Sequence, residues 1–439
     1  MDHAEISSEE FEGALFSVAQ DSSFLLAGED PPLEPLIPSS LPPTENAEAT
    51  RTLLDAIERL QQNPSLLSGD PEGFYTYEDP ILAVALRACQ INAEEIASAG
   101  QPGEELRNTN IIRFGIVGVQ ALLSRLDRSI QELAGQTPTR VIQAKHEKVR
   151  FAILGDAGYR GQAQDNVIHL ILREHQIDPF HFAIHLGDTY YGGDEAEVLK
   201  NLLGPLSSLR NAGIQVFTLV GNHDVYYGAD GFLAALKILN QPGRYFLIET
   251  PAWRIACLDT ALSALGIFRS DAKLDQGQLD WLDSLINAKD NRPLIVMSHH
   301  FIVSGWENPP PSLVHQMRER AKEGIFAWYW GHEHGCATYE RGSHGFYGAC
   351  VGNGAFNERW SQPTIAPSKP SWYATTKCAC YTKARKRHFW PHGFLELTLS
   401  NQQFLETYHL EGGVVHSRTL QGMQTTGAHQ ILSTPMANK

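Results

Sequence analysis

The sequence lacks the features of a membrane protein or a secreted one. It has no uncharged apolar run of about 18 residues, the length that a membrane-spanning helix needs. The first residues are acidic, whereas a secretory signal peptide combines a basic start with an apolar stretch. Only 6 of the 439 residues are cysteines, too few for a disulfide scaffold. These absences predict a cytoplasmic protein with reduced thiols and no membrane association.

Basic residues are also scarce relative to acidic ones. The chain has 35 Lys and Arg against 50 Asp and Glu, a formal net charge of -15. A net negative surface repels nucleic acid and anionic membranes, so neither is expected as a partner. A small phosphorylated substrate remains compatible with this charge, because bound metal cations dominate the field inside a site.

Three parts of the chain carry no motif that bears chemistry. Residues 1–48 are acidic and rich in proline, a composition typical of disordered segments. Residues 49–147 place apolar residues at helical spacing, as in the stripe from Ile112 to Ile130. They are predicted to form a helical N-terminal region that covers the active site, binds a partner or makes a homodimer. Residues 419–439 are polar and predicted to be a flexible tail.

Residues 148–418 are predicted to form one α/β domain. From Val149 to Trp330, short runs rich in Val and Ile alternate with helical patterns. This alternation is typical of layered α/β folds with buried strands. After Gly345 the helical patterns stop, and residues 346–351, 393–399 and 404–410 alternate like half-buried antiparallel strands.

Five predicted strands are followed directly by polar residues that can bind metal. The clusters are Gly155–Gly158, Gly187–Tyr191, Gly221–Asp224, Ser298–His300 and Gly331–His334. Ligands of α/β sheets bind beyond the carboxyl ends of the strands, and a glycine before the donor lets the backbone turn sharply. One such cluster alone is a common turn or helix cap. Five together form a mixed oxygen and nitrogen ligand set and predict a metal site.

The set GDAG, GDTYY, GNHD, SHH and GHEH resembles that of the calcineurin-like metallophosphoesterases, and the resemblance covers residues 149–410. Within this superfamily the sequence looks most like the purple acid phosphatase branch. Most of the superfamily has a His two residues after the first Asp, where Gly158 stands here. The purple branch lacks it and has a Tyr three residues after the second Asp, where Tyr191 stands. The resemblance implies a four-layer α/β/β/α metallophosphoesterase sandwich preceded by the helical region.

The resemblance also implies a role for each motif residue. The first metal would be bound by Asp156, Asp188, Tyr191 and His334. The second would be bound by Asp188, Asn222, His299 and His332, so that Asp188 bridges the two ions. The catalytic residues would be Asp188 and His223, which protonates or positions the leaving oxygen. The substrate pocket would include His300 and Asp224, and Arg160 is a further candidate for contact with the substrate phosphate.

The donor types bear on the metals and on the reaction. A phenolate is a hard anionic donor that suits Fe(III), so iron is predicted at the first site, while Asn and His suit Zn, Mn or Fe(II) at the second. Two such cations clamp the attacking and leaving oxygens of an in-line displacement and make a metal-bound hydroxide the nucleophile.

The predicted function is therefore binuclear-metal-dependent hydrolysis of a phosphate ester, with a phosphomonoesterase as the first choice. A phosphodiesterase acting on nucleotide or phospholipid-like diesters is the alternative, because the motifs do not determine which leaving group the enzyme accepts. An alternative of another class is a regulatory protein that binds metal without turnover. The complete ligand set argues against that alternative, since a degenerate site would have lost ligands.

Overall fold

The computed structural model describes residues 128–420, apart from 191, 263–271, 359, 366–367, 376–388 and 402. The predictions for residues 1–48, for most of the helical N-terminal region and for residues 421–439 lie outside these residues. No helix within the described part of the chain is both long enough and apolar enough to cross a membrane.

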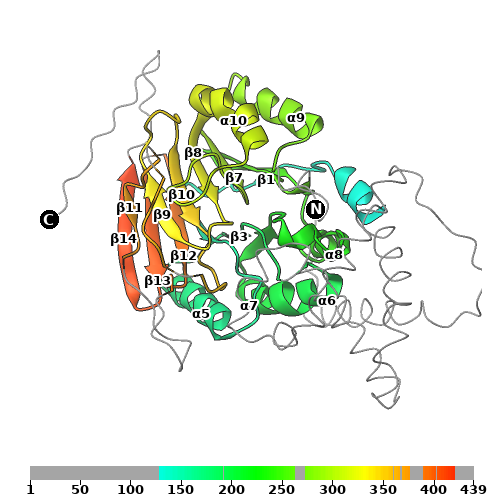
Figure 1. Ribbon diagram of the computed structural model, residues 1–439, viewed down its shortest axis with the longest axis vertical. Coiled ribbons are helices and arrows are strands. Elements are labelled where there is room, and N and C mark those ends of the chain that lie inside the picture. The colour runs from blue at the N-terminus through cyan, green and yellow to red at the C-terminus, as the bar shows by residue number, and fades with distance from the viewer. Residues whose placement is uncertain are drawn as a thin grey trace, which may run out of the picture.

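The described residues form two β-sheets that pack face to face (Figure 1). The six-stranded sheet has the strand order β14-β13-β12-β2-β3-β4 and the eight-stranded sheet the order β1-β5-β6-β7-β8-β10-β9-β11. The strands of the first are β2 (Val149–Leu154), β3 (Phe182–His185), β4 (Gln215–Thr218), β12 (Gly393–Leu399), β13 (Phe404–Leu410) and β14 (Gly413–Leu420). Those of the second are β1 (Ile142–Gln143), β5 (Phe246–Glu249), β6 (Arg254–Cys257), β7 (Leu294–Ser298), β8 (Ile325–Trp330), β9 (Cys336–Tyr339), β10 (Tyr347–Val351) and β11 (Trp372–Tyr373).

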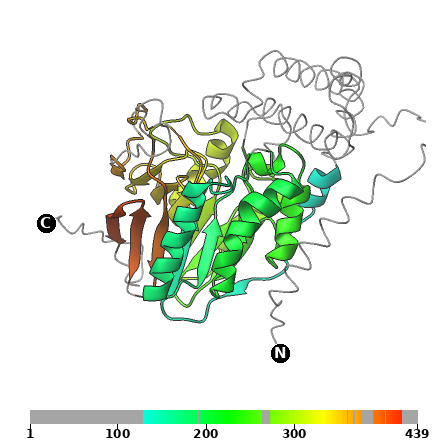
Figure 2. The same ribbon diagram turned by 90° about the horizontal axis from the view of Figure 1, so that it is seen from below.

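Helices cover the outer face of each sheet. The eight-stranded sheet is covered by α9 (Gln276–Ile286) and α10 (Pro311–Gly324). Over the six-stranded sheet lie α5 (Gln162–Ile177), α6 (Glu195–Glu197), η5 (Val198–Leu203), α7 (Gly204–Asn211) and α8 (Asp230–Ile238). Figure 2, a view from below, shows helices of this set running alongside the strands that they cover. The short η6 (His223–Val225) follows β4. The predicted α/β/β/α sandwich is thus confirmed.

The sandwich follows from strands that are buried on both faces. In β2, Phe151 and Ile153 point into the core between the two sheets, whereas Ala152 and Leu154 pack under the helices. Successive strand residues alternate between faces, so a strand buried on both sides must be apolar throughout. This is why the strand patterns in the sequence are continuous apolar runs.

Parallel pairing brings the motifs to one edge. Strands β2, β3 and β4 are parallel neighbours, and so are β6, β7 and β8. Strands β12, β13 and β14 are antiparallel, as predicted for residues 393–399 and 404–410, but β12 and β13 are buried on both faces and not half-buried. Strand β14 pairs Thr419 with Leu405 and Leu420 with Phe404, so the sheet extends two residues past the predicted domain limit of 418.

A buried ionic cluster joins the two sheets. Glu406 of β13 accepts hydrogen bonds from the Tyr329 hydroxyl of β8 at 2.6 Å and from Arg418 Nε at 2.7 Å. Arg418 also donates to the carbonyl of Tyr339 in β9 at 3.0 Å. In Glu406→Gln the Arg418 charge loses its buried partner. We therefore expect the free energy of unfolding to fall by about 3 kcal/mol in chemical denaturation.

Glu340 provides the matched control for this prediction. It lies 3.6 Å from Arg418, but its side chain is 60% exposed against 1% for Glu406. Exposed ion pairs contribute little, so Glu340→Gln should change the free energy of unfolding by less than about 1 kcal/mol. Equal losses of unfolding free energy in the two variants would show that the contribution of Glu406 to stability does not depend on its burial.

Candidate metal centre

The five motifs meet where β2, β3, β4, β7 and β8 end, and backbone contacts join them across the two sheets. The carboxylate of Asp156, which follows β2, accepts a hydrogen bond from the backbone N–H of His332 at 2.8 Å. Asp188, which follows β3, accepts one from the backbone N–H of His223 at 3.0 Å. Residues predicted to bind metal from opposite sheets therefore share one site.

The backbone is strained at four of the predicted ligands. Asp156, Asp188, His332 and His334 have positive φ angles of 57°, 76°, 70° and 40°. Within the described residues only one other non-glycine residue, Asn240, has a positive φ. Such conformations cost roughly 1–3 kcal/mol each and cluster at functional sites. The left-handed backbone at these residues turns the chain sharply at the end of each strand, where the four side chains meet.

The first group of donor atoms gathers around a tyrosine hydroxyl. The Tyr190 hydroxyl lies 2.9 Å from Asp156 Oδ1, 3.2 Å from Asp188 Oδ2 and 2.8 Å from His334 Nε2. His334 Nε2 is 3.3 Å from Asp156 Oδ1. Donors that share one ion at about 2 Å lie about 3 Å apart, so these four fit a single cation.

The tyrosine in this group is Tyr190, the residue before the predicted ligand Tyr191. Tyr191, the predicted ligand, lies outside the described residues, and its neighbour Tyr190 is almost fully buried at the centre of the group. An isolated bridge pairs Gly158 with Thr189 just before it. Because this bridge holds the two loops together, the residue two places after Asp188 points inward.

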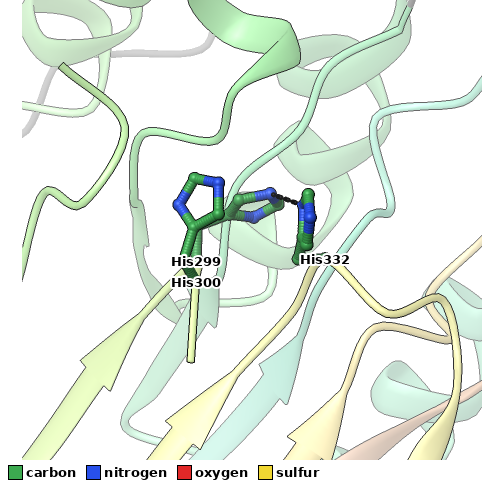
Figure 3. Close-up of side chains that lie close together, drawn as sticks. All are labelled: His299, His300 and His332. Atoms are coloured by element: carbon green, nitrogen blue, oxygen red, sulfur yellow. Dashed lines mark hydrogen bonds between the residues drawn. The ribbon is translucent and has the colours of Figure 1, made fainter. Parts of the chain in front are cut away.

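The second group of donor atoms centres on His299. Its Nε2 lies 2.9 Å from Asn222 Oδ1, 3.1 Å from His332 Nδ1 and 3.4 Å from Asp188 Oδ1. Figure 3 shows the contact between the His299 and His332 rings as a dashed line. Its Nδ1 faces the Leu186 carbonyl at 2.9 Å, and a carbonyl can only accept, so Nδ1 holds the proton of the neutral ring. The lone pair on Nε2 then faces other acceptors. A second proton or a metal cation among these atoms removes the conflict, so the donor set fits a metal.

The titration of these groups reflects the same crowding of acceptors. Burial lowers the pKa of His299, but the neighbouring Asp188 carboxylate outweighs it and raises the pKa to about 9. Burial likewise lowers the pKa of His334, while Asp156 and Glu358 raise it to about 10. Without a cation, the two carboxylate-rich groups therefore hold protons on these rings. Protons and metal ions compete for the same nitrogen atoms.

Asp188 connects the two groups. Its Oδ2 is in contact with the Tyr190 hydroxyl, and its Oδ1 faces His299. Burial opposes ionisation of this carboxyl, but the charges of His299 and His223 hold its pKa well below the usual value. One carboxylate with an oxygen in each group is the arrangement predicted for a ligand that bridges two metals.

Outer contacts orient the ligands, and several come from residues that the motifs do not include. The Asn222 amide donates to the Tyr226 hydroxyl at 2.5 Å, which turns Asn222 Oδ1 toward His299. Glu358 lies 3.8 Å from the outward Nδ1 of His334, and Glu307 lies 3.9 Å from the outward Nε2 of His332. Carboxylates beside the second nitrogen of a ligating His are typical of metal sites. These residues lie on loops, where sequence spacing carries no signal.

The remaining predicted residues lie around the two groups. The His223 ring packs between Tyr190 and Tyr226, with ring centroids 4.6 and 4.7 Å apart. Asp224 is buried beneath the site, where its Oδ2 accepts from the backbone N–H groups of Asp188 and Gly221, so it braces two ligand loops. Burial and the charge of Asp188 raise the Asp224 pKa to about 6.

Two residues predicted to line the substrate pocket differ in their surroundings. The Nδ1 of His300 lies 2.9 Å from the Thr260 hydroxyl, and the His300 ring contacts those of His299 and His332. Arg160 is half-exposed and pairs with Asp165 at 2.9 Å. The structure thus brings His300 into the centre and shows Arg160 bound to a neighbouring surface carboxylate.

Comparison with known proteins gives a family match for part of the chain. Residues 149–336 match the family model of the calcineurin-like phosphoesterases. A search of curated proteins finds no match. The family match and the donor set together support a phosphoesterase hydrolase.

Among solved structures, the chain is similar to the GAP50 anchor in the inner membrane complex of Plasmodium, with a TM-score of 0.47 and 16% identity over 64% of this chain and 90% of that one. It is also similar to a dimetal phosphatase from Danio rerio, with a TM-score of 0.44 and 12% identity over 63% of this chain and 99% of that one. A third is PhoD, with a TM-score of 0.43 and 12% identity over 68% and 74% of the two chains. These likenesses are too distant to bear on what the chain does.

Proposed function

We propose that this chain, whose residues 149–336 form a calcineurin-like phosphoesterase domain, hydrolyses phosphate monoesters with two metal ions. The observation that carries the proposal is the convergence of oxygen and nitrogen acceptors on both sides of Asp188. Two cations bound there would neutralise the charge of the phosphate and lower the pKa of water.

The two groups of donor atoms differ in chemistry, and this supports two different ions. The first ion would be held by Asp156, Asp188, Tyr190 and His334 and the second by Asp188, Asn222, His299 and His332. A phenolate in the first group favours Fe(III), the assignment that gives the site its purple acid phosphatase character. The amide oxygen and imidazoles of the second favour Zn(II), Mn(II) or Fe(II).

The other residues of the site hold and move protons. His223 lies against Tyr190, and its backbone N–H is bound to Asp188, so its imidazole stands beside both groups. This position supports a role in giving a proton to the departing oxygen of the substrate. Phe356 stacks on Tyr190 with ring centroids 4.4 Å apart and so covers one face of the Tyr190 ring.

The proposal is tested with a matched pair of chromogenic substrates, p-nitrophenyl phosphate and bis-p-nitrophenyl phosphate. Assays of protein loaded with iron and zinc, or with manganese, should give a kcat/KM at least about 10-fold higher for the monoester. The reverse ratio would make the protein a phosphodiesterase. Binding of two metal ions without turnover of either substrate would favour the regulatory alternative.

A further inference from the structure

We propose that His300 is a third imidazole ligand of the second metal ion and that it makes this site selective for Zn(II). The proposal rests on the proposed function, because it concerns one of its two metal positions. It goes beyond that function by adding a ligand, since the family pattern supplies only His299 and His332 as imidazoles at this position.

The first step is the bend of the chain after β7. Consecutive residues of a strand point to opposite faces, so His299 and His300 could not share a site if the strand continued. The strand ends at Ser298, whose hydroxyl donates to the His300 carbonyl at 2.6 Å. The backbone N–H of His300 then donates to the Thr260 hydroxyl at 3.1 Å. These two hydrogen bonds fix the bend and turn both imidazoles toward the same side.

The second step is the arrangement of the three rings (Figure 3). The ring centroids are 4.8 Å apart for His299 and His300, 4.7 Å for His300 and His332, and 5.0 Å for His299 and His332. One ring nitrogen of each lies within 4.8 Å of those of the other two. Two nitrogens bound to one tetrahedral zinc ion lie about 3.3 Å apart, since each Zn–N bond is about 2.0 Å long. His299 Nε2 and His332 Nδ1 already lie 3.1 Å apart, so an inward rotation of the His300 ring would bring all three imidazoles onto one ion.

The third step is that each ring has an outer partner for the nitrogen that would not bind metal. His299 Nδ1 faces the Leu186 carbonyl, His332 Nε2 faces Glu307 and His300 Nδ1 faces the Thr260 hydroxyl. Ligating histidines almost always give their second ring nitrogen to such a partner, which fixes the tautomer. The Thr260 hydroxyl can accept the Nδ1 proton of His300, and in that tautomer the Nε2 lone pair of His300 is available to a metal ion.

The fourth step is the choice of metal. Three imidazoles beside the Asn222 and Asp188 oxygens make nitrogen the majority of the donor set, which suits zinc, whereas magnesium and manganese prefer carboxylate and water oxygens. His300 is only 4% exposed, and its ring contacts those of His299 and His332, so it lies against the second group of donor atoms.

The test counts imidazoles at zinc directly. Zinc-edge X-ray absorption of protein loaded with one equivalent each of iron and zinc reports only the zinc environment. We expect three imidazoles per zinc in the wild type and two in His300→Asn. The Zn(II) dissociation constant of the variant should rise about 10–100-fold. His315→Asn, which removes an exposed imidazole from α10, should change neither value.

Thr260→Val is a second variant that keeps the imidazole and removes the hydroxyl that orients it. It should weaken zinc binding several-fold. Two imidazoles per zinc in the wild type, or an unchanged zinc affinity in His300→Asn, would overturn the proposal. The wild-type count decides the question even where a variant fails to fold. A wild type that binds no metal would overturn the proposed function instead, so the two failures are distinguishable.

Discussion

The Asp188→Asn variant should lose about 1000-fold or more in kcat/KM toward p-nitrophenyl phosphate, equivalent to about 4 kcal/mol of transition-state stabilisation. Each oxygen of Asp188 faces one of the two donor groups. The substitution replaces one of these oxygens with an NH₂ group, whose hydrogen atoms point at acceptors and repel a cation. It also removes the negative charge that holds two cations close together. We expect the content of tightly bound metal to fall along with the rate.

This variant should fold, because the substitution suits the local backbone. Asp188 has a φ of 76°, and Asn is among the residues that adopt this left-handed conformation most readily. The matched control is Asp178→Asn, which removes a half-exposed carboxylate paired with Lys148 and should leave kcat/KM unchanged. Full activity of Asp188→Asn, measured together with its metal content, would mean that the site lies elsewhere.

The strands that carry the site are predictable from the sequence, for a physical reason. The sequence predicts a strand directly before the cluster Ser298–His300, and β7 (Leu294–Ser298) lies there, because a strand buried on both faces must be an unbroken apolar run. The grouping of the predicted ligands follows from the sequence for a related reason. A polar residue directly after such a run can only lie at the sheet edge, where parallel strands place their carboxyl ends together.

The contacts that surround the ligands are not predictable in this way. Thr260, Glu307 and Glu358 come from loops that follow other strands and helices, and they reach the site only through the packing of the two sheets. The spacing of residues along the chain does not predict such long-range contacts. The role of the predicted helical N-terminal region likewise depends on tertiary packing that its periodicity does not report.

Sequence position alone does not determine which of the adjacent tyrosines, Tyr190 or Tyr191, contributes its hydroxyl to the site. Within a strand, alternation would decide which of Tyr190 and Tyr191 points inward. After Asp188, the left-handed backbone and the bridge between Gly158 and Thr189 end that alternation. The motif position therefore indicates Tyr191, while the described structure places the Tyr190 hydroxyl among Asp156, Asp188 and His334.

The Tyr190→Phe variant should consequently lose the visible absorption band of the iron-loaded protein. A phenolate bound to Fe(III) transfers charge to the metal and gives the protein its colour, and phenylalanine has no oxygen to do so. Burial, together with the charges of Asp156 and Asp188, raises the pKa of Tyr190 well above its usual value, so without a cation the phenol stays protonated. The band should therefore appear only when iron binds, and metal titration followed by visible spectroscopy measures it.

Tyr191→Phe is the matched control, since it removes the neighbouring hydroxyl and should keep both the band and the iron. The opposite result, with the band kept in Tyr190→Phe and lost in Tyr191→Phe, would return the ligand to the position that the purple acid phosphatase resemblance implies. A wild type that holds iron without any such band would show that neither tyrosine binds Fe(III). In that case the hydrolytic proposal would still stand on Asp188 and the imidazoles, because a divalent pair can clamp a phosphate ester equally well.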